Sequence, residues 1–285
     1  MEVFMFYKRI DIPVIYSKIE TVHDDYQPFL ECYIHKQTPE INRGCRRPAV
    51  IICPGGAYYF KSEREAEPVA LRYLAYGMNT FILQYSVKPN KYPCAMLELA
   101  EAVRTVRAHS EEWDIDPQKI IICGFSAGGH VCASLGTKWD SMLLKKYFGE
   151  ETAPASWKPD GMILCYPVIT MGEYTHKESK ENLIGDTSYT AEETSLENSI
   201  SKHTVPAFVW HTFEDTAVPA ENSLIFCMGL KKMGIPFELH IYEAGEHGLS
   251  LCDRETLDQA YQLQPDNENW LKMSVNWINR LGSRL

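Results

Sequence analysis

Short apolar runs alternate with amphipathic stretches along most of this chain. Brief runs rich in β-branched residues predict buried strands, and apolar residues repeating every three or four positions predict helices. Strands are predicted at 48–53, 79–85, 119–125, 161–165, 207–211 and 237–242. Helices are predicted at 62–76, 94–110, 220–233 and 268–281. This alternation predicts an α/β fold with a mainly parallel sheet and helices on both faces.

Two segments before the first parallel strand have a different pattern. Residues 10–17 and 29–35 predict two strands that form an antiparallel entry to the sheet. At the start of the 62–76 helix, Ser62 is a candidate N-cap, and Glu65 three residues later would complete a capping box.

Residues 170–204 interrupt the alternation, because they are polar and only partly periodic. A short helix is predicted near 190–200. Two interpretations remain open: a solvated surface loop, or a small lid over a site, since long loops in compact domains usually have a function.

The stretch Ile120 to His130 joins a strand to a helix through Gly124-Phe125-Ser126-Ala127-Gly128. This is the G-x-S-x-G pattern, with a helix running on to about Lys138. A serine on such a sharp turn stands clear of the sheet, and the helix N-terminus faces any negative charge that develops beside it. Ser126 is therefore a candidate nucleophile.

A serine nucleophile needs a base, usually a histidine that a carboxylate orients. His247 lies in a glycine-flanked loop after the 237–242 strand, and Asp215 lies in the loop after the 207–211 strand. The order Ser126, Asp215, His247, each after a separate strand, is that of the α/β-hydrolase arrangement.

Three neighbouring residues compete for these roles. His130, in the helix after Ser126, is expected to be a packed or capping residue, and His211 to form a hydrogen bond below the site. Glu214 is the rival of Asp215 and is expected to face solvent.

An oxyanion hole requires two backbone N–H groups aimed at the developing negative charge. Ala127, the residue after the nucleophile, is expected to supply one. Gly56 or Ala57, in the glycine-rich turn after the 48–53 strand, is expected to supply the other. An ordinary turn between strand and helix is the alternative.

The charge balance argues against two classes of partner. With 28 Lys and Arg against 38 Asp and Glu, the net charge is −10, and an acidic surface does not attract nucleic acid or anionic membranes. A small-molecule ester is the expected partner, and no oligomeric state is indicated.

Length and cysteine usage bear on organisation and compartment. The 285 residues contain no obvious linker, so one domain over 1–285 is expected, with 170–204 as a possible small lid. The nine scattered cysteines form no C-x-x-C pair and are interpreted as reduced, mostly buried thiols of a cytoplasmic protein. We find no signal-peptide pattern and no apolar run of membrane-spanning length.

Four segments together resemble the α/β-hydrolase superfamily: Pro54–Tyr58, Gly124–His130, Val209–Pro219 and Glu246–Leu249. They are most similar to its small acetylesterase and lipase-like branch, often labelled xylan or sugar esterases. The resemblance covers about residues 30–285. It implies an eight-stranded sheet and hydrolysis of small esters, including acetyl groups on sugars.

The chain departs from this branch at two positions. Ala57 stands where many relatives carry a third glycine, which hardly affects a backbone donor. Ser86 follows Tyr85 where many relatives have an arginine, and this difference bears on the packing near the site.

The mechanism expected is acyl transfer through an acyl-enzyme. His247 removes the Ser126 proton, Asp215 orients the imidazole, and the oxyanion donors stabilise the intermediate, with no cofactor or metal required. The competing hypotheses are a peptidase of the prolyl-oligopeptidase type, which usually carries a large extra domain, and a non-catalytic binding protein on this fold.

Tyr58 and Tyr59 directly follow the proposed oxyanion residues. Either they pack the loop against the body, or one of them faces the alcohol side of the ester, where a ring with a hydroxyl suits a sugar. Bulky rings there would also favour acetyl over long acyl groups.

Overall fold

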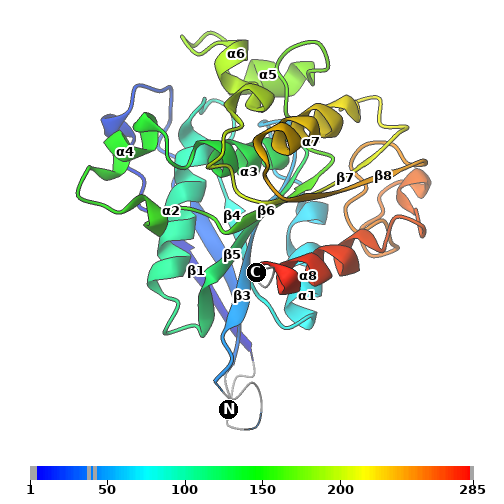
Figure 1. The fold of residues 1–285 in the computed structure, drawn as a ribbon, viewed down its shortest axis with the longest axis horizontal. Helices are drawn as coiled ribbons and strands as arrows, with labels where there is room; N and C mark the ends of the chain where they lie inside the picture. Colours follow the sequence, from blue (N-terminus) through cyan, green and yellow to red (C-terminus); the bar gives the residue numbers. More distant parts are fainter. Residues whose placement is uncertain (1–4, 37–39, 41–43, 283–285) are drawn as a thin grey trace.

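The computed structural model describes residues 5–36, 40 and 44–282. Its eight described strands form one sheet in the order β1-β2-β4-β3-β5-β6-β7-β8 (Figure 1). The strands are β1 (Met5–Asp11), β2 (Phe29–His35), β3 (Arg47–Cys53), β4 (Asn79–Gln84), β5 (Ile115–Phe125), β6 (Gly161–Cys165), β7 (Ala207–Thr212) and β8 (Phe237–Tyr242). Strand β2 runs antiparallel to β1 and β4, and all other neighbours are parallel.

The first strand differs from the prediction. Strand β1 ends at Asp11, whereas 10–17 was expected, and the chain then enters a short 3₁₀ turn at Tyr16–Lys18. Pro13 explains the difference, because proline has no N–H to donate to a ladder and is disfavoured inside a strand. The antiparallel entry itself is confirmed.

Helices cover both faces of the sheet, as the alternating pattern predicts. The described helices are α1 (Glu67–Ala75), α2 (Cys94–Ala108), α3 (Ala127–Lys138), α4 (Met142–Phe148), α5 (Lys177–Leu183), α6 (Ala191–Thr194), α7 (Glu221–Met233) and α8 (Trp270–Arg280). Ile51 of β3 belongs to a core shared with α2, α3 and α7. Its neighbour Ile52 belongs to a second core shared with α1 and α8. Because both faces are buried, the central strands are apolar throughout rather than alternating.

The predicted helix at 62–76 is in fact two elements. A 3₁₀ turn spans Glu63–Glu65, and α1 begins only at Glu67. The expected capping box is wrong, since the Ser62 side chain makes no capping hydrogen bond. Glu65 instead points inward and is 3% exposed.

The 170–204 excursion holds α5, α6 and a 3₁₀ turn at Leu196–Ser199, so the helix expected near 190–200 is present in two short pieces. In Figure 1, α5 and α6 lie at the top, beyond α3 and α7. The Leu196 N–H donates to Ile169 O at 3.1 Å, and Asn222 Nδ2 donates to Tyr174 O at 2.9 Å. The excursion is therefore packed on the body and is not a solvated loop.

Candidate active site

The predicted site residues follow four strands at the same edge of the sheet. The loop 54–58 comes after β3, Ser126 after β5, Asp215 after β7 and His247 after β8. Parallel neighbours bring the carboxyl ends of these strands together, which is where sites form in α/β sheets.

Ser126 lies in a strained turn between β5 and α3. Its backbone has φ 51° and ψ −117°, a conformation that non-glycine residues rarely adopt and that is typical of nucleophile turns. The flanking glycines are required by close approach, since a Cβ on Gly124 would lie 2.2 Å from Gly128 O, and one on Gly128 would lie 2.0 Å from Cys53 O. The turn therefore tolerates no larger side chain at either position.

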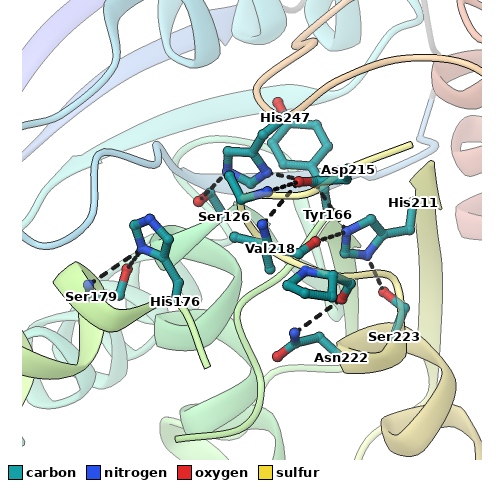
Figure 2. A network of polar contacts seen from close by, with 12 residues as sticks. Ser126, Tyr166, His176, Ser179, His211, Asp215, Val218, Asn222, Ser223 and His247 are labelled. Atoms are coloured by element: carbon teal, nitrogen blue, oxygen red, sulfur yellow. Dashed lines mark hydrogen bonds and ion pairs between the residues drawn. The ribbon is translucent and has the colours of Figure 1, made fainter. Parts of the chain in front are cut away.

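The structure brings Ser126, His247 and Asp215 into one hydrogen-bonded chain (Figure 2). His247 Nε2 lies 2.7 Å from Ser126 Oγ, and His247 Nδ1 lies 2.6 Å from Asp215 Oδ2. Because an ionised carboxylate only accepts, Nδ1 carries the imidazole proton and Nε2 accepts from the serine hydroxyl. The Asp215 side chain is fully buried, whereas that of His247 is 22% exposed, so the base is accessible and the acid is not.

Hydrogen bonds keep Asp215 ionised. Its Oδ1 accepts the N–H groups of Ala217 at 3.1 Å and Val218 at 2.9 Å. Burial alone would raise the pKa of Asp215, but hydrogen bonds from His211 and His247 outweigh burial and hold the pKa below its ordinary value. The negative charge is thus maintained beside the imidazole that would become positive.

His211 lies beneath this chain, as expected. Its Nε2 donates to Val218 O at 2.8 Å and contacts Asp215 Oδ2 at 3.2 Å, while Nδ1 accepts from Ser223 Oγ at 2.8 Å. The ring is fully buried and bonded to the acid, so it supports Asp215. Glu214 is exposed, as expected, and its carboxylate also accepts the Gly245 N–H at 2.9 Å.

Hydrogen bonds to the preceding carbonyls fix the orientation of the two candidate oxyanion N–H groups. Gly56 O accepts the N–H groups of Tyr59 and Phe60, at 2.8 and 3.1 Å. In a trans peptide the Ala57 N–H then points the opposite way. Ser126 O accepts the N–H groups of Val168 and His130 at 3.1 and 3.2 Å. The Ala127 N–H, in the same peptide plane, therefore points in the opposite direction from Ser126 O.

Both of these N–H groups remain available to a ligand. Within the part of the chain that the structure describes, neither Ala57 nor Ala127 donates its N–H to a protein acceptor. Ala57 and Tyr58 both have positive φ, 54° and 58°, a backbone conformation that non-glycine residues rarely adopt and that is found at functional turns.

The structure corrects the expectation of substrate contact for Tyr58. Its side chain is buried, 3% exposed, and its hydroxyl lies 2.8 Å from His130 Nδ1. Tyr58 therefore packs the loop against the body, which was the alternative interpretation. Tyr59 is 61% exposed, with its ring centroid 5.9 Å from Lys88 Nζ.

His130 is a packed residue, as expected. Its Nε2 lies 2.8 Å from Thr194 O in the excursion. Burial lowers the pKa of His130 to about 4, so the ring is neutral, donates from Nε2 and accepts the Tyr58 hydroxyl at Nδ1. The buried His130 imidazole therefore links α3 by hydrogen bonds to two segments. One is the loop 54–58, called the oxyanion loop below because it holds the candidate oxyanion donors, and the other is the 170–204 excursion.

Ser86, one of the two positions at which the sequence departs from the expected pattern, belongs to a buried polar cluster. The Ser86 N–H donates to Glu98 Oε2 at 2.7 Å, and the hydroxyls of Ser86 and Tyr16 also bond the Glu98 carboxylate. Burial raises the pKa of Glu98. At this position Glu98 therefore has an uncharged serine as its hydrogen-bond partner, and not a positively charged side chain.

Two residues near the base were missed by the sequence reasoning. The Tyr166 ring stands edge-on to the His247 ring, with centroids 5.1 Å apart. It directly follows β6, so its place at a strand end was the available signal. His176 caps α5 through Nδ1, which accepts the Ser179 N–H at 3.3 Å. Burial and then the nearby charge of His247 lower the pKa of His176, which places it within electrostatic reach of the site (Figure 2).

Two searches of the described residues give negative results. No cluster of three His, Cys, Asp or Glu side chains among them could hold a metal ion. No described helix is long and apolar enough to cross a membrane.

Known proteins are similar to this chain in sequence and in fold. Endo-1,4-beta-xylanase B of Butyrivibrio fibrisolvens is 38% identical over 236 residues, which are 80% of this chain and 35% of the xylanase. The acetylxylan esterase of Xylanibacter ruminicola is 28% identical, over 87% of this chain and 49% of that protein. The chain therefore spans only about a third to a half of the length of these two relatives.

A solved structure matches over nearly its whole length. The acetyl ester-xyloside bifunctional hydrolase of Caldicellulosiruptor lactoaceticus has a TM-score of 0.81 and 35% identity, with 96% of each chain covered. Fold and relatives together place this chain in the esterase branch of the α/β-hydrolases. Within this class, the chain belongs to the BD-FAE family, whose model matches residues 36–230.

Proposed function

We propose that this chain hydrolyses short-chain, chiefly acetyl, carboxylic esters through an acyl-enzyme on Ser126. The observation that carries the proposal is the continuous chain from Ser126 Oγ through His247 to Asp215, with contacts of 2.7 and 2.6 Å. A serine activated in this way attacks an ester carbonyl.

The proposed reaction assigns a role to each of these groups. His247 Nε2 takes the Ser126 proton as Oγ bonds to the carbonyl carbon, and the Ala127 and Ala57 or Gly56 N–H groups stabilise the oxyanion. His247 then protonates the alcohol as the carbon–oxygen bond breaks. Water, deprotonated by His247, hydrolyses the acyl-enzyme and restores Ser126. Throughout, Asp215 stays ionised and stabilises the imidazolium.

The sugar side of the proposal is supported by relatives and by two side chains. Acetylxylan esterase and the acetyl ester-xyloside hydrolase are among the similar proteins. Tyr59 offers an exposed ring for a sugar face. His176 Nδ1 accepts the Ser179 N–H, so the neutral ring carries its proton on Nε2, and Figure 2 shows that second nitrogen turned away from Ser179. We assign this donor to a hydroxyl of the alcohol group.

The test combines labelling with substrate comparison. A fluorophosphonate probe should label the wild-type protein and not Ser126→Ala. Turnover of p-nitrophenyl acetate and an acetylated xyloside, without cleavage of an aminoacyl-nitroanilide, is expected. Amide cleavage would favour the peptidase, and absence of both labelling and turnover would favour a binding protein.

We also propose the compartment, the domain organisation and the partner of the protein. We place the chain in the cytoplasm as one domain, with a small-molecule ester as its partner and neither nucleic acid nor membrane. Eight buried cysteines, including Cys53, Cys123 and Cys132, support a reducing compartment. Quantitative thiol titration of the protein isolated from cells would test this, because disulfides would contradict it.

A further inference from the structure

Glu65 is a buried carboxylate that the proposed reaction does not use. Its two oxygens have separate partners: Oε2 accepts the Gly55 N–H at 2.7 Å, and Oε1 accepts the Tyr166 hydroxyl at 2.7 Å. The residue is 3% exposed. Burying a carboxylate is costly unless it is fully hydrogen-bonded, so both contacts are needed for it to remain there.

The first contact reaches the oxyanion loop. Gly55 immediately precedes Gly56 and Ala57, the proposed oxyanion donors. A Cβ at Gly55 would lie 2.7 Å from Glu65 Oε2 and 3.0 Å from Ser126 Cβ. The carboxylate, the loop backbone and the nucleophile are therefore in direct succession, with no space for other groups between them.

The second contact reaches the loop of the base. The Tyr166 hydroxyl donates to Glu65 and accepts the Ser250 N–H at 2.9 Å, three residues after His247. Its ring packs edge-on against the imidazole at 5.1 Å. Burial and then the charge of Glu65 raise the pKa of Tyr166, so the hydroxyl keeps the proton that it donates.

We infer that Glu65 is a positioning residue that sets the oxyanion loop and the His247 loop relative to Ser126. This inference rests on the proposed function. One carboxylate fixes the two loops that must be aligned in the transition state, although its side-chain hydrogen bonds go to Gly55 and Tyr166 and not to the triad. A displacement of either loop by a fraction of an ångström would weaken transition-state binding more than substrate binding.

The informative substitution is Glu65→Gln, which keeps the size of the side chain. Both partners of Glu65 are donors, and a glutamine has one acceptor oxygen and one donor NH₂. The glutamine oxygen can accept from only one of the two donors, the Gly55 N–H or the Tyr166 hydroxyl. The glutamine NH₂ group then faces the other donor, with which it cannot form a hydrogen bond in the same way. We expect kcat to fall about 10- to 100-fold, with KM changed less than threefold.

The matched control is Glu67→Gln, two residues along. Glu67 also accepts a tyrosine hydroxyl, that of Tyr33 at 2.9 Å, but this pair lies outside the site. The Glu67→Gln variant should therefore keep the wild-type kcat. Equal kcat losses in the Glu65 and Glu67 variants would show a general effect of losing a hydrogen bond between a carboxylate and a tyrosine, and would overturn the inference.

A trifluoromethyl ketone, which forms a tetrahedral adduct with the serine, separates positioning from folding. Glu65→Gln should weaken its inhibition by the same factor as kcat/KM, because both depend on the oxyanion donors. If Glu65→Gln does not fold, Tyr166→Phe removes the base-loop contact alone and should lower kcat about tenfold. Wild-type kcat and inhibition in Tyr166→Phe or in folded Glu65→Gln would overturn the inference while leaving the proposed function intact. An inactive wild type would instead contradict the proposed function.

Discussion

His211 and His247 both contact the same oxygen of Asp215, Oδ2, at 3.2 and 2.6 Å. One ring is fully buried and the other partly exposed. The buried imidazole holds the carboxylate in place and ionised, and the exposed one is left free to exchange a proton with Ser126. A second histidine beneath the acid thus stabilises the charge on which the base depends.

Replacing His211 should therefore alter the pH dependence of the reaction. Without its donor the pKa of Asp215 rises toward the ordinary value, so the charge is lost at a higher pH as the solution is acidified. In His211→Leu, kcat/KM at pH 4 relative to pH 7 should fall below the wild-type ratio. His211→Gln, whose amide can still donate, is the control. Identical ratios in all three proteins would contradict this role.

Ser126→Ala should fold normally and lose ester hydrolysis by at least about 10⁴-fold, since removal of a nucleophile leaves only binding and oxyanion contributions. Steady-state rates with p-nitrophenyl acetate, alongside a melting curve, measure both effects. Retention of more than a few per cent of activity would point to a different serine.

The buried His130 should make stability depend on pH. Its pKa in the folded protein is about 4, below the ordinary 6.5 of an unfolded chain. The unfolded state therefore binds the proton first, so the stability is present above about pH 6.5 and is lost as the pH falls toward 4. The size is on the order of 3 kcal/mol.

Urea unfolding at pH 7.5, 6 and 5 would test this effect. The stability difference between wild type and His130→Asn should shrink steadily as the pH decreases. A difference that does not change with pH would mean that the pKa of His130 is the same in the folded and the unfolded protein.

The two tyrosines of the oxyanion loop should behave differently. Tyr58→Phe leaves His130 Nδ1 without its donor, which costs about 1–3 kcal/mol of stability and lowers kcat/KM equally for simple and sugar esters. Tyr59→Ala should lower kcat/KM for acetylated sugars several-fold more than for p-nitrophenyl acetate.

The acyl-chain preference is a separate prediction. In a series of p-nitrophenyl esters, kcat/KM should be highest for the acetyl or propionyl ester, and a maximum at octanoyl would reject the acetylesterase proposal.

His176 offers a test that separates its cap from its free nitrogen. Asparagine is a good N-cap, so His176→Asn should keep α5 intact while removing the Nε2 donor, whereas His176→Ala removes both. KM for an acetylated xyloside should rise about 5- to 10-fold in both variants, with KM for p-nitrophenyl acetate unchanged in His176→Asn. Wild-type KM for the xyloside in His176→Asn would show that the residue only caps the helix.

The sequence alone was sufficient to predict a mainly parallel sheet and to name Ser126, Asp215 and His247 as candidates that the fold then brings together. The reason is that apolar periodicity identifies the strands, parallel strands end at one edge, and residues directly after them must therefore meet. The turn at Ser126 is equally local, because its glycines and its serine lie within five residues of one another.

Only the tertiary structure assigned partners to the residues around these three. Glu65 matched a capping box with Ser62, yet its carboxylate bonds Tyr166, 101 residues away. Tyr58 seemed suited to face a substrate, yet its hydroxyl is bonded to His130, 72 residues away. A carboxylate or hydroxyl can pair with any suitable donor or acceptor, and which one it meets depends on how the loops pack across the sheet edge. Local patterns therefore determine which residues reach the site, and long-range packing decides what holds them there.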